Sequence, residues 1–134
     1  MVNAAVPRVM IVEDDPGIAF LERETFERAG FEVKEFALGQ PALECIARCE
    51  SPALLVLDYL LPDMTGAYIV TDLGDRIPAL PVVMVTGYPD PAVAEQVRAA
   101  GVRDYISKDV DLKFLDQMLE AAQAAIASDP EPPS

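Results

Sequence analysis

Five short apolar segments alternate with longer amphipathic segments along the chain. The apolar segments cover residues 8–12, 31–36, 53–57, 81–85 and 104–107. Continuous apolar runs are typical of strands buried on both faces of a sheet, whereas the alternating segment 31–36 fits an edge strand. Because strands and helices alternate, the pattern predicts a parallel sheet with helices on both faces, a three-layer α/β sandwich.

The amphipathic segments carry signals for where helices begin and end. Asp15 and Asp90 are each followed by proline, the usual order of an N-cap and a first turn, and Gly30 and Gly101 stand where these two helices should end. Further helices are expected over 40–50, 65–76 and 111–127. The tail 128–134 is polar and proline-rich and is expected to be disordered, so the folded domain should cover 8–127.

The last predicted helix is apolar over a wide arc. At about 100° per residue its apolar side chains form two neighbouring stripes: Leu112, Leu115, Leu119, Ala122 and Ile126, then Phe114, Met118, Ala121 and Ala125. We expect the first stripe to pack on the sheet. We expect part of the second stripe, centred on Phe114 and Met118, to meet a partner protein or a second copy of the chain.

Length and composition indicate a single globular domain. The 134 residues suffice for one core, and no apolar stretch approaches the roughly 20 residues of a membrane span. Residues 1–7 lack the features of a signal peptide, so we expect a cytoplasmic protein. The net charge of −13, from 23 acidic and 10 basic residues, disfavours binding to nucleic acid or anionic membranes. A protein or a cation is the expected partner.

The residue types present exclude several kinds of chemistry. The chain has no histidine, which rules out Ser-His-Asp and Cys-His catalysis, histidine-rich metal sites and a phosphohistidine carrier. Cys45 and Cys49 are the two cysteines, and their spacing fits no four-ligand metal pattern. We expect both to be buried, reduced thiols.

Polar residues follow the apolar segments at their carboxyl ends. Glu13 and Asp14 follow the first, Asp58 the third and Thr86 the fourth, and Ser107 and Lys108 end the fifth. In an open parallel sheet these ends form the working edge, so three carboxylates, a hydroxyl and an ammonium group should converge there. Asp15 is explained locally as a helix cap.

This set of groups fits a divalent cation and phosphoryl chemistry. Glu13, Asp14 and Asp58 offer the oxygen ligands that Mg²⁺ prefers. A carboxylate so placed can attack phosphorus, because the cation and Lys108 neutralise the phosphoryl oxygens while Thr86 donates a hydrogen bond. The sequence therefore predicts an aspartyl-phosphate site.

Four motifs resemble the receiver domain of two-component response regulators: VMIVEDDPGI, LLVLDYLLPDMTG, PVVMVTGYPD and GVRDYISKD. The resemblance covers nearly all of residues 8–127, in order. It implies a flavodoxin-like fold with strand order 2-1-3-4-5. It also implies two-component phosphorelay signalling, in which Asp58 accepts a phosphoryl group from a sensor histidine kinase or a phosphotransfer protein.

The same resemblance implies roles for individual residues. Glu13, Asp14, Asp58 and the backbone carbonyl of Leu60 would hold Mg²⁺ or Mn²⁺. Thr86 and Lys108 would bind the phosphoryl group, and Thr86 and Tyr105 would switch a surface formed by the fourth helix, the fifth strand and the fifth helix. That surface would meet a downstream protein or form a homodimer. Leu60 and Tyr88 occupy the positions that tune acyl-phosphate lifetime.

The sequence departs from the family pattern after the lysine. Receivers most often have proline there, whereas this chain has Asp109, which puts the usual cis peptide in doubt. Neither Leu60 nor Tyr88 is a carboxylate or amide suited to positioning an attacking water.

Three other functions fit parts of the pattern. A haloacid dehalogenase-type phosphohydrolase would need an acid where Leu60 stands. A flavodoxin would prefer hydroxyls and glycine after the first strand. A receiver-like module that is never phosphorylated would not need the complete set of site residues. No output domain follows the last helix, so we expect a stand-alone receiver that signals by contact, or a domain whose tail begins a linker.

Overall fold

The computed structural model describes residues 6–48, 52–77, 79–109 and 111–127. Within these residues, five parallel strands form one sheet of order β2-β1-β3-β4-β5. The strands are β1 (Arg8–Val12), β2 (Glu32–Phe36), β3 (Leu54–Asp58), β4 (Val82–Thr86) and β5 (Asp104–Ser107). This confirms the predicted flavodoxin-like architecture, strand order and edge position of β2.

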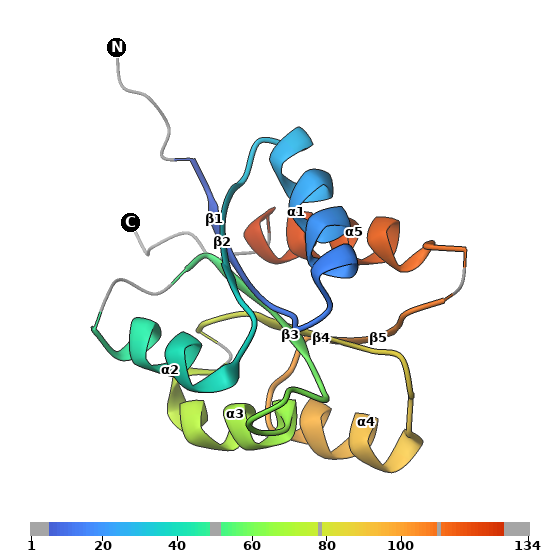
Figure 1. The fold of residues 1–134 in the computed structure, drawn as a ribbon. Helices are drawn as coiled ribbons and strands as arrows, with labels where there is room; N and C mark the ends of the chain where they lie inside the picture. The colour runs from blue at the N-terminus through green and yellow to red at the C-terminus, as the bar shows by residue number, and fades with distance from the viewer. Residues whose placement is uncertain (1–5, 49–51, 78, 110, 128–134) are drawn as a thin grey trace.

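Helices cover both faces of the sheet, as Figure 1 shows. They are α1 (Pro16–Arg28), α2 (Gly39–Arg48), α3 (Gly66–Leu73), α4 (Pro91–Ala99) and α5 (Phe114–Ala127), and a short 3-10 helix, η1 (Gly74–Arg76), follows α3. α1 and α5 lie on one face, and α2, α3 and α4 lie on the other. The side chains of each strand alternate between the two faces, so there are two cores.

The two cores divide the strand residues by parity. Val9 and Ile11 of β1 pack with Phe26 of α1 and with α5, whereas Met10 and Val12 pack with α2, α3 and α4. β3 and β4 are buried at every position, as continuous apolar runs predict. When this alternation continues past the end of a strand, the residue that follows the strand points toward the same face as the residue two positions before it.

The predicted helix ends are confirmed where side chains cap them. Asp15 accepts hydrogen bonds from the amides of Gly17 and Ile18 at the start of α1, and Asp90 accepts one from the amide of Ala92 at the start of α4. α2 is capped from a distant segment, because both carboxylate oxygens of Asp63 accept amide hydrogen bonds from its first two residues. This cap ties the loop after β3 to the start of α2.

The prediction for the last helix is wrong in its start and in its orientation. α5 begins at Phe114 rather than at 111. Phe114 and Met118 are fully buried against the sheet and α1, whereas Leu112 is 38% exposed and Leu115 and Leu119 are only half-buried. The second stripe is therefore the core-facing one, and its two large residues are not available to a partner.

The remaining sequence predictions were more accurate or fall outside the described residues. The expected helix over 65–76 is divided into α3 and η1. Cys45 is buried and free, as expected. Cys49 and the proline-rich tail 128–134 lie outside the described residues. No helix among the described residues is long and apolar enough to span a membrane.

Candidate functional site

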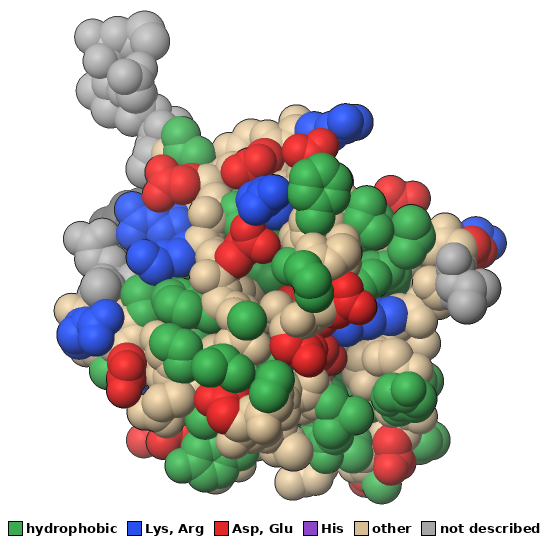
Figure 2. All heavy atoms as spheres, in the orientation of Figure 1, with side chains coloured by type: hydrophobic (Ala, Val, Ile, Leu, Met, Phe, Trp, Pro, Cys, Tyr) green, Lys and Arg blue, Asp and Glu red, His purple; other side chains and the backbone are tan. Residues whose placement is uncertain are grey.

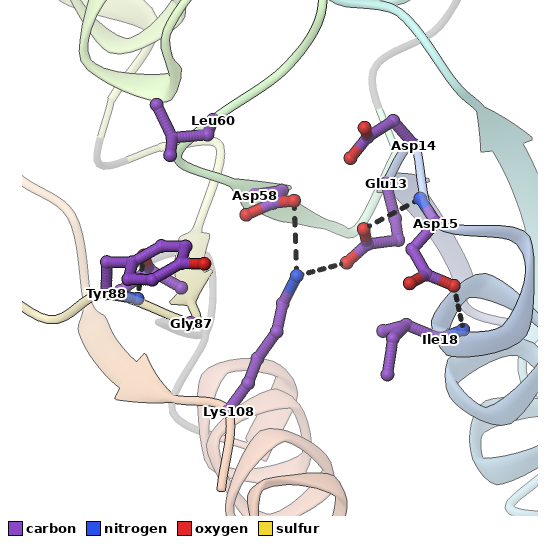
Figure 3. A pocket seen from close by; sticks show the side chains of 10 residues that line it. Glu13, Asp14, Asp15, Ile18, Asp58, Leu60, Gly87, Tyr88 and Lys108 are labelled. Carbon is purple, nitrogen blue, oxygen red and sulfur yellow. Dashed lines mark hydrogen bonds and ion pairs between the residues drawn. The ribbon is translucent and has the colours of Figure 1, made fainter.

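The carboxyl ends of β1, β3, β4 and β5 meet at one edge of the sheet around a pocket of about 390 Å³. Figure 2 shows acidic side chains gathered near the middle of the face that carries these strand ends, with hydrophobic side chains around them. The pocket is lined by Glu13, Asp14, Asp15, Ile18, Asp58, Leu60, Thr86, Gly87, Tyr88 and Lys108 (Figure 3). Apart from Tyr105, every residue assigned a site role from the sequence lies here.

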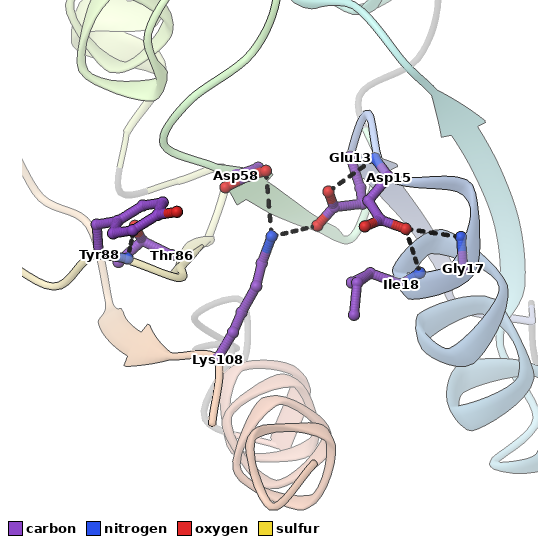
Figure 4. A network of polar contacts seen from close by, with 8 residues as sticks. All are labelled: Glu13, Asp15, Gly17, Ile18, Asp58, Thr86, Tyr88 and Lys108. Atoms are coloured by element: carbon purple, nitrogen blue, oxygen red, sulfur yellow. Dashed lines mark hydrogen bonds and ion pairs between the residues drawn. The ribbon is translucent and has the colours of Figure 1, made fainter. Parts of the chain in front are cut away.

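Lys108 joins two of the carboxylates. Its Nζ lies 2.6 Å from Oε1 of Glu13 and 3.1 Å from Oδ2 of Asp58 (Figure 4). Glu13 and Asp58 are both buried, with 4% and 7% of their surfaces exposed. An ammonium ion between two carboxylates compensates charges that would otherwise be costly at the edge of a core.

Burial and charge oppose each other at this ion pair. Burial is the largest influence on Glu13 and raises its pKa to about 7, although Lys108 and the amide of Asp15, which donates to Oε2, both act to lower it. Burial lowers the pKa of Lys108, but the hydrogen bond and charge of Glu13, with a contribution from Asp58, outweigh it and raise the pKa. Lys108 therefore stays protonated at neutral pH.

Three carboxylates are close enough to share a cation. Glu13, Asp14 and Asp58 each offer an oxygen, and these oxygens all lie within 4.8 Å of one another. Asp14 is exposed, so a cation could enter from solvent while keeping some of its water. This all-oxygen donor set fits a hard divalent cation such as Mg²⁺ or Mn²⁺.

The rest of the pocket wall comes from β4 and from the loops after β3 and β4. Thr86 is buried, and its hydroxyl accepts a hydrogen bond from the amide of Tyr88 at 3.1 Å. Leu60 and Tyr88 are exposed, with 49% and 79% of their surfaces accessible. These two side chains form the outer rim of the pocket on the side facing away from α1 (Figure 3).

Tyr105 lies outside the pocket. Its side chain is half-buried, and its hydroxyl accepts a hydrogen bond from the amide of Asp90, the N-cap of α4, at 3.1 Å. It packs against the core beneath α2, α3 and α4. Tyr105 thus links β5 to the start of α4, whereas Thr86 and Lys108 line the pocket itself.

One acidic residue near the site was missed by sequence analysis. Glu22 of α1 is almost completely buried, and its pKa is influenced by Glu13, Lys108 and Asp58. Its place four residues after Ile18 and four before Phe26, on the apolar stripe of α1, was a signal that could have revealed it.

Comparison with known proteins agrees with this fold. Residues 9–120 match the model of the response regulator receiver domain, and the chain belongs to this family. Members of the family are, in general, signalling domains of two-component systems.

The relatives include several transcriptional regulators. The chain is 34% identical over 129 residues to the photosynthetic apparatus regulatory protein RegA of Rhodovulum sulfidophilum, covering 95% of this chain and 69% of that protein. It is 29% identical over 122 residues to the C4-dicarboxylate transport transcriptional regulatory protein DctD of Rhizobium meliloti, covering 91% of this chain but 26% of that protein. The match to DctD thus involves only a small part of a longer protein.

Solved structures show the same fold. The crystal structure of a CheY-like response regulator receiver domain protein from Methanospirillum hungatei JF-1 has a TM-score of 0.79 at 27% identity, over 92% of this chain and 98% of that one. A LuxR-family two-component response regulator from Aurantimonas sp. SI85-9A1 has a TM-score of 0.76 at 27% identity, over 90% of this chain and 86% of that one. The likeness extends through nearly the whole described fold.

Proposed function

We propose that this chain accepts a phosphoryl group on Asp58 from a histidine kinase or a phosphotransfer protein. The observation that carries the proposal is the position of Lys108, whose Nζ bridges Asp58 and Glu13 beside Asp14 and Thr86. Such a site combines a nucleophile, a cation-binding set and two donors for phosphoryl oxygens. The proposal places the chain in the cytoplasm, where such a donor would meet it.

The proposed reaction replaces one bond to phosphorus by another. An oxygen of the Asp58 carboxylate forms a bond to phosphorus while the bond between phosphorus and the donor's imidazole nitrogen breaks, and that nitrogen takes up a proton. A divalent cation, when bound by Glu13, Asp14, Asp58 and the backbone carbonyl of Leu60, supplies positive charge to the phosphoryl oxygens. Lys108 exchanges its bond to Asp58 for one to a phosphoryl oxygen.

Thr86 and Tyr105 provide the proposed link to a protein surface. The hydroxyl of Thr86 turns from the amide of Tyr88 toward the phosphoryl group, and Tyr105, which accepts a hydrogen bond from the amide of Asp90, turns inward behind it. The conformation of α4, β5 and α5 then shifts between two populated states. This surface is where we propose that a downstream protein docks or that a homodimer forms.

Leu60 and Tyr88 set the lifetime of the proposed acyl phosphate. Both side chains lie on the pocket rim, and neither can activate or orient a water as a carboxylate or amide could. The same feature argues against a phosphohydrolase, which would need an acid at Leu60. Because the rim lacks such a group, we expect Asp58 to lose its phosphoryl group slowly.

Labelling with a small phosphodonor tests the proposal. The wild-type chain, incubated with acetyl phosphate and Mg²⁺, should gain the mass of one phosphoryl group, and chelation of the cation should prevent it. Asp58→Asn should remove the gain, because the amide is a poor nucleophile. Asp75→Asn is the matched control, since Asp75 lies on η1 and is exposed outside the pocket, and it should label as the wild type does.

Two outcomes would contradict the proposal. Labelling that persists in Asp58→Asn would mean that another residue accepts the phosphoryl group. A wild-type chain that binds Mg²⁺ but is not labelled by acetyl phosphate or by any histidine kinase of its source organism would favour an interaction module that is never phosphorylated.

A further inference from the structure

Helix α1 carries a buried acid that the proposed relay does not use. Glu22 has 1% of its surface exposed, and its Oε1 has no hydrogen-bond partner among the described residues. An ionised carboxylate without donors is costly in a protein interior, so such a group keeps its proton or depends on charges nearby. The protonation of Glu22 is therefore under the control of its surroundings.

Glu22 stands on α1 between a residue that lines the pocket and a residue of the apolar core. Ile18, one helical turn earlier on the same face of α1, lines the pocket, and Phe26, one turn later, is fully buried against the sheet. Ile18 also packs against the core formed with Phe26. A charge on Glu22 would thus lie in a poorly solvated layer behind the pocket wall, where electrostatic interactions are stronger than in water.

The strands supply the charges that face this carboxyl. After burial, which is the largest influence, Glu13 at the end of β1, Asp58 of β3 and Glu35 of β2 raise the pKa of Glu22, and Lys108 after β5 lowers it. Together these influences bring the pKa to about 8. Two of the three carboxylates, Glu13 and Asp58, belong to the acidic pocket.

The other groups packed around α1 lie outside the pocket. Glu35 is paired with Arg23 of α1, whose Nη1 lies 2.7 Å from its Oε1, and neither residue lines the pocket. The buried face of α5, which also packs against α1, consists of apolar side chains. The pocket charges are therefore the part of this environment that ligand binding can change.

We propose that Glu22 is an internal proton site coupled to cation occupancy of the acidic pocket. This inference rests on the proposed cation site. A cation at Glu13 and Asp58 offsets the negative potential that these carboxylates impose on Glu22 and so favours loss of its proton. By linkage, loss of the proton tightens cation binding by the same factor. A pKa that falls by about one when the cation binds corresponds to about tenfold tighter binding.

Carboxyl-carbon NMR of the whole ¹³C-labelled chain tests the coupling directly. Glu22 is titrated from pH 5 to 10, once with chelator and once with saturating Mg²⁺. The Glu27 resonance is recorded beside it to correct for general effects of Mg²⁺ on chemical shifts, because Glu27 lies on the same helix and is exposed. We expect Glu22 to show a midpoint within this range, and that midpoint to fall by about one with Mg²⁺. A Glu22 carboxyl without a midpoint in this range, or a midpoint that Mg²⁺ leaves unchanged, overturns the inference.

Calorimetric titration with Mg²⁺ gives an independent readout. Between pH 7 and pH 9 the affinity of the wild-type chain should rise several-fold more than that of Glu22→Gln, whereas Glu27→Gln should follow the wild type. Equal pH profiles for wild type and Glu22→Gln would overturn the inference. If Mg²⁺ binds without moving Glu22, only this inference fails; if no cation binds at any pH, the proposed cation site fails with it.

Discussion

Glu22 should weaken the fold increasingly as the pH rises, and Glu22→Met should remove this dependence. In the unfolded chain the carboxyl ionises near its ordinary pKa of 4.5, whereas burial keeps it protonated in the folded chain up to about pH 8. Between these values the unfolded state releases a proton that the folded state retains. The free energy of unfolding therefore falls with rising pH across this window, and it is unaffected by Glu22 below pH 4.5.

The size of the effect follows from the two pKa values. A rise from 4.5 to about 8, at about 1.4 kcal/mol per pKa unit, sets a ceiling of about 5 kcal/mol for the loss between pH 4.5 and pH 8. Entry of water or small rearrangements of α1 would reduce it, so we expect a few kcal/mol. Methionine is unbranched and similar in size, so Glu22→Met preserves the packing without the ionisable group.

Urea unfolding followed by circular dichroism, without divalent cations, measures this effect at pH 5 to 9. The chain has no tryptophan, so helix content is the appropriate signal. Glu22→Met should gain stability relative to wild type as the pH increases, and Glu27→Met should show no such trend. The comparison at each pH removes most of the contribution of Glu13, which is common to both chains. A constant difference between Glu22→Met and wild type across this range would refute the reasoning.

Two further predictions concern packing, and urea unfolding checks both. Met118→Ala should lower the free energy of unfolding by about 2–5 kcal/mol, because Met118 is fully buried in the core. Leu112→Ala, at an exposed position, should cost much less, and equal losses would contradict the orientation of α5. Gly66→Ala should cost about 1–3 kcal/mol, since its Cβ would lie 2.7 Å from the backbone oxygen of Asp58. Gly87→Ala has open space around it and should be neutral, and a neutral Gly66→Ala would contradict the packing at the start of α3.

The fold could be predicted from the sequence because the strands of a parallel sheet have a simple signature. β3 and β4 are buried at every position and are continuous apolar runs, and their carboxyl ends carry Asp58 and Thr86. The predicted bounds of these strands were one residue early, since a strand-ending polar residue does not match the apolar pattern. Because the carboxyl ends of parallel strands lie at one edge of the sheet, the predicted fold also placed most site residues together.

The orientation of α5 could not be settled from its pattern. The two apolar stripes lie next to each other, so a small rotation of the helix decides which one faces the sheet. In the structure, the helix is rotated so that Phe114 and Met118 face the core. The number of large side chains does not decide this rotation either, because the first stripe holds three leucines and an isoleucine, whereas the core-facing second stripe holds two alanines.

The contacts inside the pocket could not be predicted from the sequence either. The motifs place Lys108, Glu13 and Asp58 at the same edge, but the choice of partner depends on side-chain conformation and on which face each residue points toward. Glu13 and Lys108 each stand two positions after a strand residue, Ile11 and Ile106, whose side chain faces α1 and α5, so they point toward the same face. This shared face explains the 2.6 Å contact between them.

In the proposed relay, the bridge made by Lys108 is the route by which a change at Asp58 would reach the neighbouring strands. One ammonium group serves both Glu13 and Asp58, so any change in the charge on Asp58 changes the force that holds Lys108 to Glu13. Lys108 follows β5 directly, and the amide of Lys108 donates to the backbone oxygen of Thr86. A shift of Lys108 therefore acts on β4, β5 and the segment leading to α5 together. On the other side of β5, Tyr105 is bound to the start of α4. In the proposed relay, phosphorylation of Asp58 would thus bias the packing of both helices that flank this strand, which is what a switchable docking surface requires.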